Sequence, residues 1–317
     1  MKLPVRALAL LLTLIFCAVV SVSCFERKNQ FSIEIITAGT ETEFWSSAYS
    51  GAQAAAEVYN ASVKLFGPAL EEDYSRQENA LRQSIERKPD AIIIGAADSN
   101  MAAELANLAA DNGIQIVAAA SPIGGDKRVT YVGSDNYELG QTLSREIKSR
   151  FLGGAVAVIS FTKESLAAEE RELGFLEEMA GDPAFRTLET LYCGSDAEKA
   201  KQLALKLLAD NDDLTAIACL NAQSTIGASR AIEQSGYQGI FLGGIDCSVE
   251  EAELIERGVI GVTLLQNPYA IGYFGVETAV KKLRGESPDK NIYTKFHIIT
   301  RENMFKEEYQ RLIFPLP

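Results

Sequence analysis

Short apolar runs alternate with longer amphipathic stretches along most of this chain. The runs are rich in Val, Ile and Leu, which is typical of strands buried on both faces of a parallel sheet. Strands are expected over 31–38, 62–67, 91–96, 114–120, 129–134, 155–160, 186–192, 214–220, 239–244, 259–265 and 292–300. The clearest helices are expected over 44–60, 74–87, 100–111, 137–150, 249–257 and 268–284.

The order of these elements predicts the fold class. Strands that alternate with helices form a parallel sheet wrapped by helices, with right-handed crossovers. The alternation runs to about residue 133 and starts again after Gly153-Gly154, which predicts an α/β protein with two similar lobes. The sequence contains no long linker or low-complexity stretch, so we expect short hinges between the lobes.

The chain begins with a segment that is typical of a secretory signal. Lys2 and Arg6 are followed by an apolar run, and the next charged residue is Glu26. Small residues stand directly before Cys24, so 1–23 looks like the signal peptide of a bacterial lipoprotein, although Ser21 stands where such sites usually carry leucine. We therefore expect Cys24 to carry a lipid such as palmitate, with 24–30 as a lipid-anchored linker outside the cytoplasm. Plain secretion and an uncleaved anchor remain alternatives.

Composition narrows the choice of partners. The formal net charge is −13, and an acidic body repels nucleic acid and anionic lipid headgroups. Of the five cysteines, Cys17 lies in the signal and Cys24 at the proposed anchor, so that Cys193, Cys219 and Cys247 remain. An odd number without CxxC spacing predicts neither a disulfide framework nor a zinc site. No DxDxDG loop is present, so we expect no bound metal, and no cofactor motif suggests a cofactor.

Four polar residues follow apolar runs and form the main candidate site. They are Arg171, Asn221, Asp246 and Gln266. Ligands of open parallel sheets bind outside the carboxyl ends of the strands, so we expect these side chains to gather there. An acid, a base and two amides would suit a neutral ligand rich in hydroxyl groups. Arg171 could instead be a solvated helix residue, Asp246 a helix cap, and Asn221 a turn residue.

A set of short motifs then points to a family. They include Glu43-Phe44-Trp45, Lys88-Pro89-Asp90, Gly133-Ser134-Asp135-Asn136, Arg171 followed by Gly174-Phe175, Gly243-Gly244-Ile245-Asp246 and Gln266-Asn267-Pro268. Together and in this order, the chain resembles the type I periplasmic binding proteins, in particular their ribose- and galactose-type sugar-binding group. The resemblance covers about Phe31 to Pro315.

The resemblance implies a three-strand hinge and a ligand between the lobes. It places 31–133 with 267–290 in the N-terminal lobe, and 134–266 with 291–317 in the C-terminal lobe. Phe44 and Trp45 would sandwich the sugar ring, and Arg171, Asn221, Asp246 and Gln266 would bind its hydroxyls. Asp98, Ser121 and Asn136 are weaker ligand candidates, because Asp98 and Asn136 could simply cap helices.

Two positions depart from the ribose-type pattern. Gly95 stands where those proteins carry asparagine, and Ser121 stands where they carry an aspartate that grips two hydroxyls. The polar set of the second lobe is therefore complete and that of the first lobe is thinned. This argues for a monosaccharide other than ribose.

The sequence does not predict an enzyme. GxSxG, GxxxxGK[ST] and GxGxxG motifs are absent, and the single histidine, His297, lies in an expected strand. The pairs Glu71-Glu72, Glu169-Glu170 and Glu177-Glu178 are expected to be solvated. The resemblance implies a monomeric binding protein that delivers a monosaccharide to the membrane permease of an ABC importer. The alternative is a sugar sensor that presents its ligand to a membrane histidine kinase or chemoreceptor.

Overall fold

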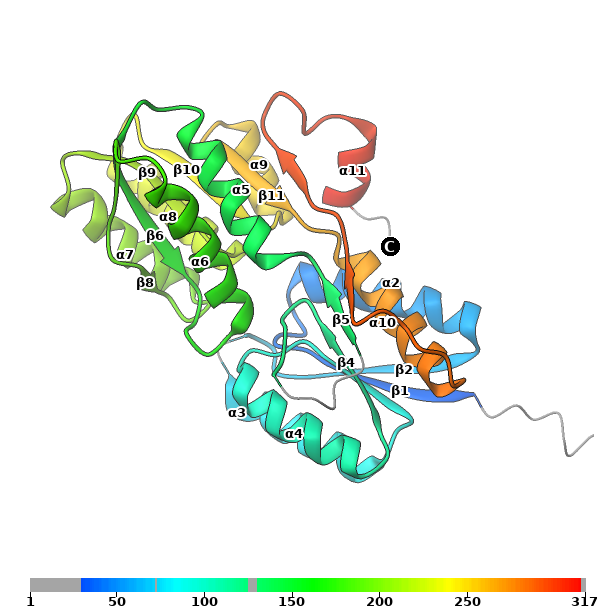
Figure 1. The fold of residues 1–317 in the computed structure, drawn as a ribbon. Coiled ribbons are helices and arrows are strands. Elements are labelled where there is room, and N and C mark those ends of the chain that lie inside the picture. Colours follow the sequence, from blue (N-terminus) through cyan, green and yellow to red (C-terminus); the bar gives the residue numbers. More distant parts are fainter. Residues whose placement is uncertain (1–29, 72, 125–129, 315–317) are drawn as a thin grey trace, which may run out of the picture. The chain divides into compact units, whose positions relative to one another are not determined.

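The computed structural model describes residues 30–71, 73–124 and 130–314. The proposed signal peptide, Cys24 and most of the linker lie outside these residues. Two sheets with helices on both faces make up the described chain (Figure 1). The expected two-lobed α/β architecture is confirmed.

The first sheet has the strand order β12-β5-β4-β3-β1-β2. Its strands are β1 (Phe31–Ile36), β2 (Ala61–Phe66), β3 (Ala91–Ile94), β4 (Gln115–Ala119), β5 (Thr130–Gly133) and β12 (Asn291–Tyr293). The helices packed on it are α2 (Glu43–Tyr59), α3 (Tyr74–Arg87), α4 (Ser99–Asp111) and α10 (Pro268–Leu283). Helices α3 and α4 cover one face together, and α2 packs beside α10 (Figure 1).

The second sheet has the order β13-β11-β10-β9-β6-β7, with β8 also paired to β6. Its strands are β6 (Gly154–Ser160), β7 (Phe185–Thr187), β8 (Leu191–Tyr192), β9 (Leu214–Cys219), β10 (Phe241–Ile245), β11 (Val262–Leu265) and β13 (His297–Ile299). The helices packed on it are α5 (Asn136–Lys148), α6 (Leu166–Ala180), α7 (Ala197–Asp210), α8 (Ala222–Ser235) and α9 (Val249–Glu256), and α11 (Glu307–Ile313) is the last helix of the described chain.

Alternate residues of the strands fill separate cores on the two faces of the second sheet. In β6, Val156 and Val158 pack with α5 and α6, whereas Ala157 and Ile159 pack with α7 and α8. This explains why the strands are continuous apolar runs, because neither face of such a sheet meets water. Cys219 is buried in the second of these cores, as expected.

The chain passes between the sheets three times. It does so between β5 and α5, between β11 and α10, and between β12 and β13. The single strand expected over 292–300 is wrong: residues 291–293 pair with β5 in the first sheet, and residues 297–299 pair antiparallel with β11 in the second. The chain therefore leaves the first sheet after Tyr293, and not at the expected boundary of residue 291. Likewise, the strand expected over 186–192 is broken into β7 and β8.

Candidate functional site

A cavity of about 360 Å³ lies at the carboxyl ends of the strands of both sheets. Among the residues that line it, the first sheet and its loops contribute Phe44, Trp45, Glu71, Tyr74 and Ser121. The second contributes Phe161, Arg171, Ser195, Asn221, Asp246 and Gln266. In each sheet the strand order reverses at a central pair, β1/β3 and β6/β9, and such reversals open a crevice for ligands. The cavity volume is at the small end of the range for ligand pockets, which suits a small molecule.

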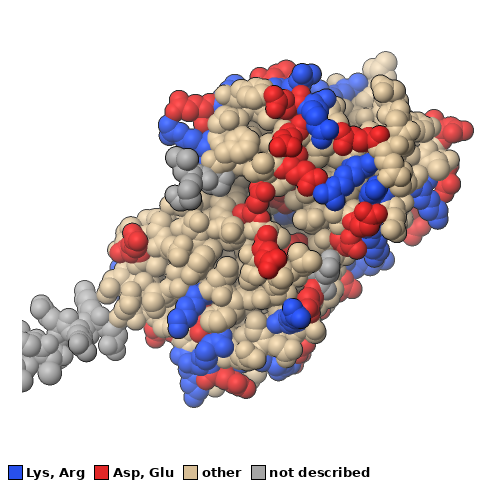
Figure 2. Space-filling model, turned by 180° about the vertical axis from the view of Figure 1, so that it is seen from behind, with Lys and Arg blue, Asp and Glu red and all other residues tan. Residues whose placement is uncertain are grey.

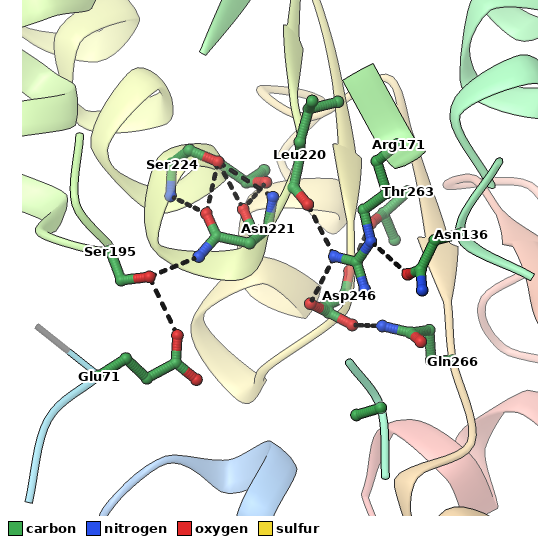
Figure 3. A network of polar contacts seen from close by, with 12 residues as sticks. Glu71, Asn136, Arg171, Ser195, Leu220, Asn221, Ser224, Asp246, Thr263 and Gln266 are labelled. Carbon is green, nitrogen blue, oxygen red and sulfur yellow. Dashed lines mark hydrogen bonds and ion pairs between the residues drawn. The ribbon is translucent and has the colours of Figure 1, made fainter. Parts of the chain in front are cut away.

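Arg171 is buried in this cavity and is not a solvated helix residue. Its Nε donates to Asn136 Oδ1 at 2.9 Å, and its Nη1 donates to the carbonyl oxygen of Leu220 at 2.8 Å (Figure 3). The same Nη1 lies 4.0 Å from Asp246 Oδ2. These contacts fix the plane of the guanidinium group before any ligand arrives, and a planar group with several donors is well suited to neighbouring hydroxyl oxygens.

Close packing of α5 against α6 places Arg171. A Cβ atom at Gly140 would lie 2.0 Å from the carbonyl oxygen of Arg171, and one at Gly174 would lie 2.2 Å from that of Tyr137. Glycine at both positions therefore lets the two helix backbones approach each other directly. The Arg–x–x–Gly-Phe motif of the sequence encodes both the guanidinium group and the approach of its helix.

Asp246 and Gln266 form a second fixed pair at the ends of β10 and β11. Gln266 Nε2 donates to Asp246 Oδ1 at 2.6 Å, and the hydroxyl of Thr263 donates to the carbonyl oxygen of Asp246. Asp246 has a φ of 82°, which is unfavourable for a residue other than glycine and costs about 1–3 kcal/mol. Burial raises the pKa of Asp246, and the nearby charge of Arg171 acts in the opposite direction. The cap of α9 is Ser248, so the expectation that Asp246 could be a helix cap is wrong.

Asn221 is both a helix cap and part of the cavity wall. Its Oδ1 accepts from the backbone N–H of Ser224 at 3.0 Å, and Ser224 completes a capping box at the start of α8. Its Nδ2 donates to Ser195 Oγ at 3.2 Å. One side of the amide therefore fixes the helix while the other faces the polar network (Figure 3).

The aromatic side of the cavity differs from the expected sandwich. Thr42 caps α2 by accepting from the N–H of Trp45, so Phe44 and Trp45 lie in the first turn of the helix. Their rings are edge to face, with centroids 5.1 Å apart and planes at 79°. To hold a sugar between them, two aromatic rings must face each other at about 7–8 Å, which is twice the distance of a carbon contact. Phe44 and Trp45 are closer than this and are not parallel, so they do not enclose a sugar ring in this arrangement. Phe161 supplies a further aromatic ring from the end of β6.

Trp45 explains the glycine at position 95. A Cβ atom at Gly95 would lie 1.9 Å from Trp45 Cη2 and within 3 Å of two further ring atoms. The indole ring therefore fills the space that a side chain at position 95 would need. The loss of the asparagine expected at this position and the presence of tryptophan are two parts of one packing arrangement.

Glu71 is the main residue of the cavity that the sequence did not indicate, and the expectation that it is solvated is wrong. It follows β2 in a loop, lines the cavity, and accepts a hydrogen bond from Ser195 Oγ at 3.0 Å. Burial raises its pKa, and the negative charge of Asp246 adds to this shift, whereas Ser195, Trp45 and the positive charge of Arg171 oppose it. Its position in a polar loop gave no periodic signal, and only the folded chain brings the loop to the ends of the second sheet.

The weaker candidates divide into three cases. Ser121 lines the cavity and shares a hydrogen bond of 3.2 Å with Ser165. Asn136 is buried outside the cavity lining and orients Arg171. Asp98 is the cap of α4, accepting from two backbone N–H groups, and is not part of the lining. Asp135, rather than Asn136, caps α5.

One thiol lies in the described cavity lining, and the single histidine of the sequence lies outside it. Cys247 is the thiol of the described lining, and burial raises its pKa, which disfavours the nucleophilic thiolate. His297 is not part of that lining; its ring lies 5.3 Å from the ring of Tyr309. Within residues 30–71, 73–124 and 130–314, no group of His, Cys, Asp and Glu side chains is arranged to hold a metal ion. In the same ranges, no helix has the length and apolar character required to cross a membrane.

The similarity to known proteins agrees with this site. Residues 33–287 match the model of the periplasmic binding protein domain. A D-ribose/D-allose-binding protein of Pseudomonas aeruginosa is 26% identical over 282 residues, which cover 83% of this chain and 86% of that protein.

Two solved structures from Agrobacterium vitis are also similar. An ABC transporter solute-binding protein bound with α-D-tagatopyranose is 29% identical with a TM-score of 0.86, and the match covers 90% of this chain and all of that one. A second solute-binding protein, with bound D-fucose, is 26% identical with a TM-score of 0.85, and the match covers 89% of this chain and all of that one. The resemblance found in the sequence is confirmed, and the chain belongs to the type I periplasmic binding proteins.

Proposed function

We propose that the protein is an extracytoplasmic solute-binding protein that captures a monosaccharide and delivers it to an ABC importer. The observation that carries this proposal is the hydrogen-bonded set of Arg171, Asn221, Asp246 and Gln266, which faces aromatic rings across a small cavity. Amides, carboxylates and guanidinium groups bind hydroxyls, and aromatic rings cover the C–H faces of a sugar. The similar proteins named above support the same class of ligand.

Contacts across the cavity support capture by closure. Ser195 of the second lobe bonds to Glu71 of the first, and the N–H of Val249 donates to Glu43 Oε2 at 2.9 Å. The N–H of Leu166 donates to Ser99 Oγ at 2.9 Å. A ligand held behind these contacts would be released only after they separate, and short crossing segments are the usual hinges of such motion.

A thermal-shift screen of the purified mature protein tests the proposal. The panel contains aldopentoses, aldohexoses, their amino and N-acetylamino derivatives, polyols and amino acids. A ligand present at a hundred times its dissociation constant should stabilise the folded protein by about 2.7 kcal/mol. Stabilisation by amino acids alone, with none by any sugar or sugar derivative, would show that the sugar assignment is wrong.

An import role is favoured over a sensor role by the similar proteins. A ribose import binding protein of Bacillus subtilis is 24% identical over 277 residues. Deletion of the gene should abolish uptake of the radiolabelled ligand, and a copy carrying Arg171→Ala should not restore it. Normal uptake in the deletion strain, together with loss of a ligand-induced transcriptional response, would support the sensor instead.

The proposal includes a lipid anchor at Cys24, which lies outside the described residues. Cells grown with an alkyne analogue of palmitate should label the wild-type protein, whereas Cys24→Ala should be unlabelled and released from the membrane fraction. Cys247→Ala is the matched control and should keep the label. Labelling that survives Cys24→Ala would contradict an anchor at this residue.

A further inference from the structure

The charges that line the cavity do not balance. The acids among the lining residues are Glu41, Glu43, Glu71, Asp246 and Glu250, and the bases are Arg171 and Arg230. Arg230 is paired with Glu250 at 2.8 Å, and Arg171 faces Asp246 at 4.0 Å. On the face of the molecule seen in Figure 2, acidic side chains gather around a small hollow. The cavity therefore contains more negative than positive groups.

Glu71 forms no direct ion pair with the described residues of the cavity, and the charge of Arg171, which already faces Asp246, acts on it only from a distance. Among the described residues, no lysine or arginine forms an ion pair with it, and its hydrogen bond comes from the neutral hydroxyl of Ser195. Glu43 differs, because its carboxylate accepts the N–H of Val249 at the start of α9. A partly buried carboxylate without a direct ion pair is costly, so a cationic group beside Glu71 would be favoured.

A second, independent observation points to a ligand rich in donors. Gln266 is only 1% exposed, its Nε2 is used by Asp246, and its Oε1 has no hydrogen-bond partner among the described residues. A buried acceptor without a partner costs about 1–3 kcal/mol, which a donor on the ligand would recover. A hydroxyl group of the ligand can supply this donor, which leaves an ammonium group of the same ligand free for Glu71.

The aromatic side is also compatible with a cation. Phe44, Trp45 and Tyr74 line the cavity together with Glu71. The faces of aromatic rings attract ammonium groups within about 6 Å of the ring centre. A carboxylate and aromatic rings in one cavity wall can therefore together favour an ammonium group over a hydroxyl.

We infer that the ligand is an amino-substituted monosaccharide or polyol, and that Glu71 binds its ammonium group while Arg171, Asn221, Asp246 and Gln266 bind its hydroxyls. This inference rests on the proposed function and narrows the class of its ligand. It assigns the selection of the ligand to the first lobe, where the hydroxyl-binding set is incomplete. Glu71 is the residue that determines specificity.

Titration calorimetry with matched ligands tests the inference on the unaltered protein. The ligands are glucose, galactose, mannose and myo-inositol, their amino counterparts, and the N-acetylated forms of these amines. For at least one stereochemistry, the amine should bind about tenfold or more tightly than both the parent and the uncharged N-acetyl form, which is the scale of a hydrogen bond between charged groups. This result needs no variant and so does not depend on the folding of one.

The variant Glu71→Gln keeps the shape of the side chain and removes its charge. It should reduce the preference for the amine to less than about threefold, because the remaining contacts do not distinguish charge. The matched control is Glu78→Gln, an exposed acid on α3 that pairs with Arg82 and lies outside the cavity lining, and it should keep the full preference. Preference retained in Glu71→Gln would overturn the role of Glu71.

The outcomes separate the two proposals. Binding of parent sugars without any preference for an amine would overturn this inference and leave the proposed function standing. Failure of every sugar and every amine to bind would overturn both. Tighter binding of the N-acetyl forms than of the amines would also contradict the inference, because acetylation removes the positive charge.

Discussion

The two sides of the cavity are built on different principles. On the second-lobe side, the side chains of Arg171, Asn221 and Asp246 hold hydrogen bonds or ion pairs with the protein itself. On the first-lobe side, Phe44 and Trp45 form an apolar surface, and Glu71 lines the same cavity with a hydrogen bond from Ser195 of the opposite lobe and no direct ion pair among the described residues. One side is arranged before the ligand arrives, while the other depends on the ligand and on the facing lobe.

This difference assigns separate tasks to the two sides. Groups that are already oriented lose little freedom on binding, so the second-lobe side supplies affinity for hydroxyls in general. A buried group with few partners discriminates between ligands, because a wrong ligand leaves it unsatisfied. We therefore expect substitutions on the second-lobe side to lower affinity, and substitutions on the first-lobe side to change which ligand is preferred.

The largest expected effect concerns Glu251, a buried carboxyl group that lies behind the second-lobe side of the cavity and is not fully hydrogen-bonded within the described chain. Glu251 is fully buried near Asp246, its Oε1 has no partner among the described residues, and burial raises its pKa to about 8. Between the ordinary carboxyl pKa near 4.5 and pH 8, the unfolded chain loses a proton that the folded protein keeps. The free energy of unfolding should therefore fall as the pH rises through this window.

Glu251→Gln should remove this loss, since glutamine can still accept the N–H of Ser248. At pH 8 the variant should be more stable than the wild type by on the order of 3 kcal/mol, and the difference should shrink toward pH 4.5. Urea unfolding at several pH values measures both trends. An equal difference between the two proteins at every pH would contradict the assignment.

Arg171→Ala tests the second-lobe side of the cavity directly. It removes donors to the ligand and leaves Asp246 without its countercharge, so affinity should fall by about 1.5–3 kcal/mol, or roughly tenfold to over a hundredfold. Titration calorimetry with the best ligand measures the change. The control is Arg186→Ala, whose exposed pair with Asp213 lies outside the cavity lining and whose loss should not change binding. Equal affinities of both variants would place Arg171 outside the site.

Gly95→Ala tests the aromatic side without touching a polar group. The added methyl group would overlap Trp45, which must move, and overpacking of this kind costs about 1–3 kcal/mol of stability. Ligand affinity should fall with it, and the near-UV circular dichroism of the only tryptophan should change. Gly124→Ala is the matched control, because its Cβ would lie 3.7 Å from Ala103 Cβ in ordinary contact. An unchanged tryptophan spectrum in Gly95→Ala would contradict this packing.

The smallest expected effect concerns the bond that joins the two sides. Ser195→Ala removes one neutral hydrogen bond to Glu71 and one from Asn221, so affinity should fall by about 0.5–1.5 kcal/mol. The dissociation rate, measured by stopped-flow fluorescence, should rise accordingly. Ser235→Ala, at the exposed end of α8, should leave the rate unchanged. A slower release from Ser195→Ala would argue against a role of this bond in closure.

The sequence alone predicted most of the fold and the polar residues on the second-lobe side of the cavity. Buried strands and helix faces leave periodic apolar patterns, and polar residues at strand ends stand out against such runs. Asn221, Asp246 and Gln266 were found in this way, Arg171 lies within α6 and was found with its Gly174-Phe175 motif, and all four line the same cavity. The ligand roles of these side chains remain predictions that the experiments above test.

Only the tertiary structure decided the other side of the cavity. Glu71 lies in a polar loop whose sequence does not differ from a solvated one, and in the fold it accepts a hydrogen bond from Ser195, 124 positions away. The edge-to-face arrangement of Phe44 and Trp45, the dependence of Trp45 on Gly95, and the passage of 291–299 from one sheet to the other also involve distant partners. Local periodicity determines which elements form, but the environment of a loop carboxylate depends on what the rest of the chain places against it.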